Sequence, residues 1–321
     1  MISCSGISKK YVSVEALKDI TFDVSQGDIF GVIGPDGSGK TTLFRILTTL
    51  MLADTGTATV NGLDVVKDYK AIRNIVGYMP GRFSLYQDLT VEENMNFFAS
   101  VFNTTVEENY DLVKDIYVQI EPFRKRKAGA LSGGMKQKLA LSCALIHKPV
   151  VLFLDEPTTG VDPVSRKEFW GMLQNLKQQG ITILVSTPYM DEAALCDRIA
   201  LIRNGSFLAI DTPQAIVNSF NEPLWAVQTN QMSQLLTDLR DNDRVANCFA
   251  FGDKHHMTIT NDEQRNPRRS QLQMKNGEAF DEINEKELEW LQEYLENKGH
   301  QDIEIDRIQP GIEDCFIRLT M

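Results

Sequence analysis

The sequence lacks the features that would place it in several common classes of protein. Its five cysteines are scattered along 321 residues without a C-x-x-C pair, so neither a disulfide framework nor a zinc site is indicated. No apolar run approaches the roughly 18 residues of a membrane-spanning helix, and residues 1–11 lack the apolar core of a signal peptide. We therefore expect a soluble, cytoplasmic protein.

Basic charge is also scarce. The chain has 33 lysines and arginines against 44 aspartates and glutamates, which gives a formal net charge of −11. Its largest basic cluster, Arg124 to Lys127, is small, and we expect a solvated loop there. Because an acidic protein without a basic face is repelled by phosphate backbones, we expect no nucleic-acid partner.

A glycine-rich stretch at residues 28–42, DIFGVIGPDGSGKTT, predicts a phosphate-binding loop. The apolar strand Ile29 to Ile33 runs into a turn that fits G-x-x-x-x-G-K-[ST], and a helix begins near Lys40. Glycines in the turn adopt backbone angles closed to residues with a Cβ, so N–H groups can cradle phosphate oxygens, and the helix start adds further free N–H groups. A plain glycine-rich turn with a solvent-facing lysine is disfavoured, because strand, spacing and helix all fit the loop.

Each polar side chain of this loop has an expected part in binding a nucleotide. Lys40 would reach the β- and γ-phosphates, and the Thr41 hydroxyl would hold Mg²⁺. The predicted nucleotide-binding residues of the loop are Gly34, Pro35, Gly37, Ser38, Gly39, Lys40, Thr41 and Thr42.

Two carboxylates follow a second apolar run. Val150 to Leu154 is five consecutive apolar residues, typical of a strand buried on both faces of a parallel sheet, and it ends in Asp155 and Glu156. Ligands bind beyond the carboxyl ends of such strands in doubly wound sheets. We expect Asp155 to complete the Mg²⁺ shell through water, and Glu156 to be the catalytic residue that polarises an attacking water.

Four ordered motifs resemble those of the ATP-binding subunit of an ABC transporter. They are GPDGSGKTT at 34–42, LSGGMKQ at 131–137, VVLFLDEP at 150–157 and TTGVDP at 158–163, and the resemblance covers roughly residues 2–213. It implies an α/β fold: a P-loop NTPase of ABC type with an antiparallel β subdomain and a helical subdomain. We expect this ATP-binding domain to span residues 1–220, with the helical subdomain at about 84–147, where apolar residues recur at helical spacing.

The resemblance also implies partners and cofactors, namely ATP, Mg²⁺, a second ATP-binding subunit and membrane-embedded permease subunits. Two ATP molecules would lie at the interface of a head-to-tail dimer, each between one subunit's P-loop and the other's LSGG segment. Asp162 matches the loop that communicates across the dimer. Tyr11, otherwise a packing residue, matches the aromatic that stacks on the nucleotide base. The signature residues that would act on the partner's ATP are Leu131, Ser132, Gly133 and Gly134.

Two positions depart from the family pattern. Gly81 stands where a glutamine usually binds Mg²⁺ and the attacking water and senses the membrane subunit, and Pro188 replaces a histidine that contacts the γ-phosphate. We expect Thr187 to cap the next helix, with Pro188 at its first position. Since Glu156 is present, the resemblance implies ATP binding with slow hydrolysis at this site, and a heterodimer with a complete partner site is favoured over a homodimer.

Residues 221–321 read as a separate C-terminal domain. Their apolar patterns follow the order β-α-β-β-α-β, a ferredoxin-like α+β plan, with a polar loop from Arg265 to Gly277. The His255-His256 pair lacks a third ligand, so a solvated strand pair is expected rather than a metal site. The terminal IQPGIEDCFIRLT resembles the last helix of accessory domains on drug and antibiotic exporters. We expect this domain to regulate the ATPase or support its dimerisation.

The leading hypothesis is an ATP-driven motor subunit, peripheral on the inner face of the cell membrane, that powers export through separate membrane subunits. Two alternatives stay open: a non-transport soluble ABC ATPase, and a nucleotide-binding regulatory module with little turnover. The departures at Gly81 and Pro188 support the second alternative. The transported substrate is not readable from the sequence.

Overall fold

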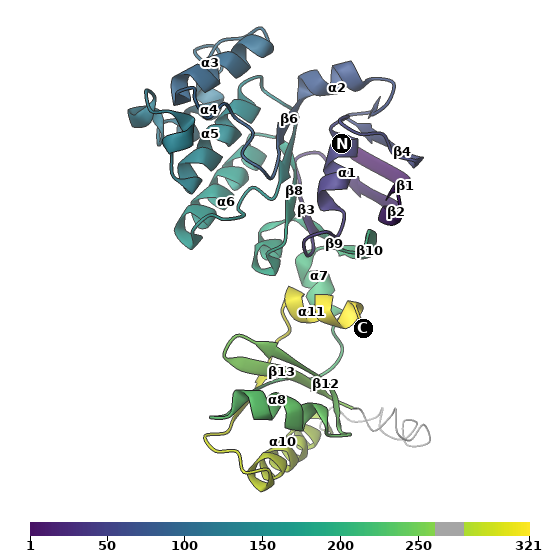
Figure 1. Ribbon diagram of the computed structural model, residues 1–321. Coiled ribbons are helices and arrows are strands. Elements are labelled where there is room, and N and C mark those ends of the chain that lie inside the picture. The colour runs from purple at the N-terminus through teal and green to yellow at the C-terminus, as the bar shows by residue number, and fades with distance from the viewer. Residues whose placement is uncertain (261–278) are drawn as a thin grey trace. The chain divides into compact units, whose positions relative to one another are not determined.

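The computed structural model describes residues 1–260 and 279–321 (Figure 1). The chain divides into two compact units, one formed by Met1–Asn218 with Ile312–Met321 and the other by Ser219–Gly311. Among the described residues, none of the helices is both long enough and apolar enough to cross a bilayer.

A six-stranded sheet runs through the first unit in the order β10-β9-β3-β8-β7-β6. Neighbouring strands from β9 to β6 are parallel, whereas β10 pairs antiparallel with β9. Strands β3, β7 and β8 are buried along their whole length, as their largely apolar sequences predict. The strands are β3 (Ile29–Ile33), β6 (Val76–Met79), β7 (Val151–Asp155), β8 (Thr182–Thr187), β9 (Arg198–Arg203) and β10 (Ser206–Asp211).

A second, antiparallel sheet of order β2-β1-β4-β5 supplies the predicted antiparallel β subdomain. One apolar core joins it to the first sheet: the rings of Phe22 and Phe30 lie 5.3 Å apart, and those of Phe44 and Phe153 6.2 Å apart. Figure 1 shows helix α1 between the two sheets. The strands are β1 (Ile2–Tyr11), β2 (Val14–Val24), β4 (Thr55–Val60) and β5 (Leu63–Asp64).

Helices gather beside β6, as the apolar spacing of this region predicts (Figure 1). The first of them, α3, begins at a capping box, in which the Thr90 hydroxyl accepts the Glu93 N–H and the Glu93 carboxylate accepts the Thr90 N–H. The helical block contains α3 (Val91–Val101), α4 (Tyr110–Tyr117), the 3₁₀ turns η1 (Glu121–Phe123) and η2 (Ala128–Ala130), and α5 (Gly133–Leu145). The other helices of the unit are α1 (Lys40–Leu47), α2 (Tyr69–Ile75), α6 (Pro163–Gln178), η3 (Met190–Leu195), α7 (Pro213–Asn218) and α11 (Ile312–Leu319).

The second unit has the expected β-α-β-β-α-β order, with an antiparallel sheet β12-β13-β11-β14. Its core includes Trp225, Leu235 and Leu291. The imidazole Nε2 of His255 lies 2.7 Å from Met232 O, and the His256 ring stacks on Phe251. The predicted loop at 265–277 lies outside the described residues. The elements are β11 (Leu224–Gln228), α8 (Met232–Arg240), β12 (Val245–Phe251), β13 (Lys254–Ile259), α10 (Ala279–Asn297) and β14 (Glu304–Ile308).

The last helix corrects the predicted extent of the C-terminal domain. Residues 221–321 were expected to form one domain, but α11 belongs to the first unit, where it contacts α7 and η3. Ile312 and Cys315 are buried there, and the Cys315 thiol lies 3.5 Å from Ile216 O. The apolar side of this short helix is covered by the first unit, a long-range contact that composition does not reveal.

Candidate nucleotide-binding site

The glycine-rich turn between β3 and α1 requires its glycines. Gly37 and Gly39 have φ of 76° and 110°, in the left-handed region that favours glycine. A Cβ at Gly39 would lie 2.3 Å from the carbonyl oxygen of Ala16, and a Cβ at Gly34 would lie 2.2 Å from that of Ile202. The turn is therefore packed closely against β2 and β9, and no other residue type fits these two positions.

Lys40 folds back into this turn. Its side chain is 2% exposed, and its ammonium donates to the carbonyl oxygens of Gly34 at 2.8 Å and Pro35 at 3.0 Å. The same nitrogen lies 3.0 Å from Glu156 Oε1. The fold thus brings the predicted phosphate-binding lysine and the predicted catalytic carboxylate into direct contact.

Ser38 supplies an observation that fits a phosphate ligand. It is buried, yet within the described part of the chain its hydroxyl has no hydrogen-bond partner. Buried hydroxyls without a partner are rare because desolvation is costly. A phosphate oxygen bound in the turn would accept this hydrogen bond.

The two predicted metal ligands meet at the end of β7. Asp155 is 2% exposed, its Oδ1 accepts the Ser186 hydroxyl at 2.7 Å, and it is also hydrogen-bonded to the Thr41 side chain. Burial raises the pKa of Asp155, and the hydrogen bonds from Ser186 and Thr41 oppose that rise. Hard oxygen ligands from one carboxylate and one hydroxyl suit Mg²⁺, which keeps several waters, so these residues fit the ion.

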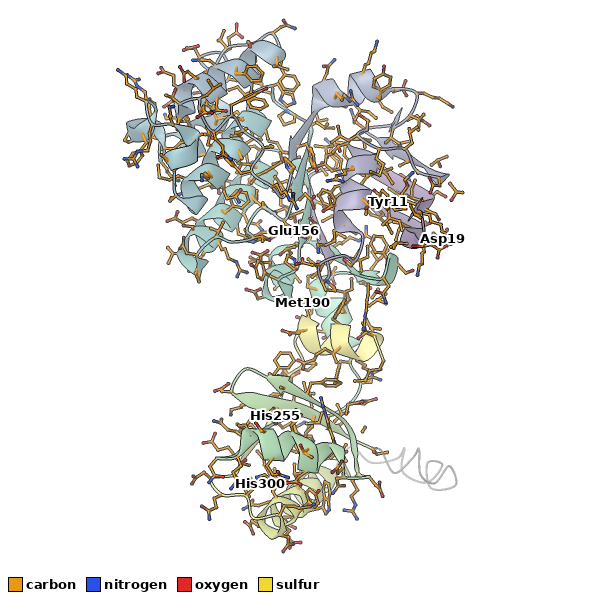
Figure 2. All side chains as sticks on the ribbon, in the orientation of Figure 1. Tyr11, Asp19, Glu156, Met190, His255 and His300 are labelled. Carbon is orange, nitrogen blue, oxygen red and sulfur yellow. The ribbon has the colours of Figure 1, made fainter. Side chains whose placement is uncertain are left out.

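Glu156 sits directly after β7 in an unusual backbone conformation. Its φ is 51°, and its N–H donates to both the carbonyl and the hydroxyl oxygen of Ser186, at 3.1 and 3.0 Å. Figure 2 shows the side chain at the end of the central sheet. Non-glycine residues held at positive φ cluster at functional sites, where neighbouring structure keeps them in place.

Both departures from the family pattern lie beside these carboxylates. A Cβ built on Gly81 would lie 3.0 Å from Asp155 O and 3.7 Å from the Cβ of Glu156. Pro188 follows Thr187, whose carbonyl oxygen accepts the N–H of Gly34 at 3.2 Å. The two positions that lack the usual side chains therefore border the Glu156 turn and the P-loop.

The predicted cap at Thr187 is wrong. The next helix, η3, is a 3₁₀ helix that begins at Met190 (labelled in Figure 2) with Tyr189 before it, so Pro188 is not its first residue. The Thr187 hydroxyl accepts the Tyr189 N–H at 3.1 Å and donates to the buried carboxylate of Glu192. The sequence pattern did not reveal that this carboxylate is buried beside the Thr187 hydroxyl.

The LSGG segment lies at the exposed start of α5. Leu131 is buried, whereas Ser132 and Gly133 are exposed, and the Ser132 hydroxyl caps the helix by accepting the Met135 N–H at 3.3 Å. A Cβ at Gly134 would lie 2.7 Å from Ser165 Oγ, so only glycine lets α5 begin this close to α6. The free N–H groups at this helix start are accessible to an anion.

Asp162 caps α6, its carboxylate accepting the Ser165 N–H at 3.0 Å. This hydrogen bond lowers the pKa of Asp162. Tyr11 ends β1 on the antiparallel sheet (Figure 2), is 39% exposed and donates its hydroxyl to Met51 Sδ at 2.8 Å. Its ring is therefore partly exposed, while its hydroxyl is already engaged.

Sequence reasoning missed two groups. Ser186 contacts both Asp155 and Glu156, and Glu192 pairs with Arg166 behind them. Ser186 could have been found as a hydroxyl at the end of the strand next to β7. Glu192 carries no such signal, because a glutamate in a short polar helix is ordinarily exposed.

Comparison with known proteins gives consistent matches over the first unit. A family model described as ABC transporter matches residues 17–159. The probable multidrug ABC transporter ATP-binding protein YbhF of Escherichia coli is 42% identical over 223 residues, which is 68% of this chain but 39% of that protein. The chain therefore spans well under half the length of that relative.

Two shorter relatives are matched over most of their length. The Nod factor export ATP-binding protein I of Burkholderia lata is 37% identical over 68% of this chain and 73% of its own. The doxorubicin resistance ATP-binding protein DrrA of Mycobacterium tuberculosis is 31% identical over 81% of this chain and 79% of its own.

A solved ATP-binding subunit of an ABC transporter has a TM-score of 0.63 and 27% identity, and covers 68% of this chain and 93% of its own. A dimeric ATP-binding cassette bound to ADP and phosphate, MJ0796, shows the same fold with a TM-score of 0.61 at 24% identity, and covers 66% of this chain and 98% of its own.

Proposed function

Because this chain belongs to the ABC transporter family of ATP-binding proteins, we propose that it is the ATP-driven motor subunit of an exporter whose membrane-embedded subunits are separate chains. The observation that carries the proposal is the contact between Lys40 and Glu156 at the mouth of the glycine-rich turn. It joins a phosphate-binding group and a water-polarising group in one site. The relatives named for drug resistance and Nod factor export support the direction of transport.

Binding of the nucleotide depends on groups that are already in place. The turn from Gly34 to Gly39 presents backbone N–H groups, and the Ser38 hydroxyl lacks a partner among the described residues. Thr41 and Asp155 would hold Mg²⁺, which supplies neutralisation of the phosphate charge. Tyr11 would stack on the base.

Hydrolysis requires that Lys40 exchange one of its contacts. The ammonium has three protons, and these are directed at Gly34 O, Pro35 O and Glu156. When a phosphate oxygen takes the place of Glu156, the carboxylate is released. It can then accept a proton from the attacking water, while Lys40 stabilises charge on the phosphate.

We propose that hydrolysis at this site is slow. Gly81 has no side chain to hold the water, and Pro188 cannot donate a hydrogen bond to the γ-phosphate. Phosphoryl transfer is catalysed by positioning and charge stabilisation, so these losses reduce the rate more than the affinity. The exposed LSGG segment would serve a better site on a different partner, which favours a heterodimer over a homodimer.

A cavity in the first unit fits docking of a membrane subunit. Its volume is about 310 Å³, and it lies where β6 and the segment after Gly81 meet the helical block. Tyr78, Phe98 and Phe102 are among its lining residues, so it offers an apolar surface beside the segment that contains Gly81. Such docking would place the subunit on the inner face of the cell membrane.

A nucleotide-binding module with little turnover is the second candidate, and Gly81 and Pro188 are the observations that favour it. A non-transport ABC ATPase has no comparable support. The segment between α3 and η2 contains two short helices and leaves no room for a long coiled coil.

The test combines turnover with co-purification. The tagged chain is purified from detergent-solubilised membranes, and MgATP hydrolysis is measured for the parent and for Glu156→Gln. We expect a membrane protein to co-purify, with turnover that rises in its presence and falls in the variant. Ribosomes in place of a membrane protein would contradict the proposal, as would turnover that the variant leaves unchanged.

A further inference from the structure

A buried carboxylate outside the proposed chemistry lies behind the site. Glu192 in η3 is 2% exposed, and its Oε1 lies 3.1 Å from Arg166 Nε. Its Oε2 accepts hydrogen bonds from the Thr158 hydroxyl at 3.1 Å and from the Thr187 hydroxyl. A buried charge is stable only when it is paired and hydrogen-bonded, and this one is both. We call these four residues the Glu192 cluster.

The members of the Glu192 cluster come from three parts of the site. Thr158 follows Glu156 by two residues, and Arg166 lies in the first turn of α6. Thr187 ends β8, and its carbonyl oxygen accepts the Gly34 N–H. A single carboxylate therefore connects the end of β8 beside the P-loop, the Glu156 turn and the helix that Asp162 caps.

The Glu156 turn needs such support. Glu156 has a positive φ, which the surrounding structure must hold, and Ser186 fixes its N–H. The chain then turns through hydrogen bonds from Thr159 N–H to Glu156 O and from Val161 N–H to Thr158 O, both 3.2 Å. In addition to the contact with Ser186, the hydrogen bond from the Thr158 hydroxyl to Glu192 fixes the turn to the rest of the unit.

We propose that Glu192 is a positioning residue for ATP hydrolysis. By holding Thr158 and Thr187, it keeps the turn that carries Glu156 aligned with the P-loop. The side chains usual at positions 81 and 188 are missing, so fewer groups position the attacking water, and catalysis depends more on the alignment of the turn that carries Glu156. The inference rests on the proposed function, because it takes Glu156 as the group that polarises the attacking water.

The first test compares Glu192→Gln with Asp191→Asn. Glutamine keeps the shape of the side chain but removes the charge that pairs with Arg166. Asp191 contacts the same guanidinium at 3.0 Å, but its side chain is 74% exposed, so its pairing is weak. We expect E192Q to lower kcat about 10- to 100-fold, because a small misplacement of a catalytic group has effects of this size.

In E192Q the ATP dissociation constant should change by less than about twofold. In D191N both kcat and the ATP dissociation constant should stay at the parent values. An unchanged kcat in E192Q, or equal losses in kcat and ATP affinity, would overturn the proposal.

The second test uses Thr158→Val, which removes one donor without leaving a buried charge unpaired and so preserves folding. We expect Thr158→Val to lower kcat by less than E192Q does. Because Thr158 and Glu192 act through one link, the double variant should be no slower than E192Q. Additive losses in the double variant would show that the two residues act separately, and would refute the link.

A third measurement does not require turnover. In the nucleotide-free full chain, amide hydrogen exchange at residues 156–162 should be faster in E192Q than in the parent, while β3 keeps its protection. If the parent hydrolyses no ATP, the proposed function fails, yet the exchange at 156–162 still decides whether Glu192 holds this turn. Unchanged exchange there would refute the positioning role.

Discussion

The ammonium of Lys40 lies 3.0 Å from Oε1 of Glu156, although the two residues belong to separate motifs. In this arrangement the lysine that we propose binds phosphate is paired with the carboxylate that we propose polarises water. The contact must open for either group to act on ATP. Ligand binding and activation of Glu156 are thereby coupled through one nitrogen atom.

The first prediction concerns the lysine. Lys40→Ala should weaken MgATP binding by about 1.5 to 3 kcal/mol, the value of a hydrogen bond to a charged group. Isothermal titration calorimetry measures the change. Lys70→Ala, an exposed lysine on α2, is the matched control and should bind like the parent. Parent-like affinity in the Lys40 variant would exclude the proposed phosphate contact.

The second prediction concerns the carboxylate. Glu156→Gln should lower the hydrolysis rate by about 10²- to 10⁴-fold, as expected for a general base, while ATP affinity stays the same or rises because Lys40 loses its competing charge. Stopped-flow binding and single-turnover hydrolysis separate the two effects. A weaker affinity with full turnover would reverse the assigned roles of these residues.

The third prediction concerns the two departures. Restoring Gly81→Gln together with Pro188→His should raise turnover by about 10²-fold with little change in ATP affinity, since both groups position rather than bind. The Cβ at position 81 lies 3.0 Å from Asp155 O, so the backbone must shift by a few tenths of an ångström. Gly81→Ala carries the same steric effect without the amide and serves as control. If the homodimer already turns over rapidly and the restored chain is no faster, the site is not slow.

The fourth prediction concerns α11. A chain in which residues 219–311 are replaced by a flexible Gly/Ser linker should bind ATP and unfold in one transition. Truncation after Asn218 should lower the free energy of unfolding by about 2 kcal/mol or more relative to that chain, because Ile312 and Cys315 are buried in the first unit. Thermal and urea unfolding give the comparison. Equal stability of the two chains would show that α11 contributes nothing to the ATP-binding unit.

The fifth prediction concerns pH and the second unit. Asp238 is buried on α8, with its Oδ2 3.0 Å from His300 Nε2 (labelled in Figure 2). Burial acts to raise the pKa of Asp238, but the contacts with His300, Gln234 and Lys298 outweigh it, and the pKa is lowered. The ionised carboxylate therefore stabilises the folded state above the pKa of an unfolded aspartate, about 3.9.

This contribution is lost as pH falls through the folded value. Asp238→Asn should destabilise the second unit by about 1 to 3 kcal/mol at neutral pH, and the difference from the parent should shrink below about pH 4. Hydrogen exchange of the α8 amides between neutral pH and pH 3 measures this difference in stability in the full chain. A difference that is constant over this range would contradict the assigned ionisation.

The sequence by itself determined the local elements of the ATP site. The glycines at 37 and 39, followed by Lys40, specify a tight turn between strand and helix, because the backbone angles at these two glycines are closed to other residues. The apolar run before Asp155 determined a doubly buried strand, and the pattern after residue 221 determined the order β-α-β-β-α-β. These features follow from periodicity and turn chemistry, which act over a few residues.

The tertiary structure alone decided which distant groups meet. The partners of Lys40, the hydroxyl of Ser186 and the burial of Glu192 depend on how β7, β8 and η3 pack, and no local pattern records that packing. The fold also assigned α11 to the first unit and buried the Glu192 carboxylate beside the Thr187 hydroxyl. In each case burial decides, because leaving an apolar face or a charged group without its partner costs more free energy than a helix cap supplies.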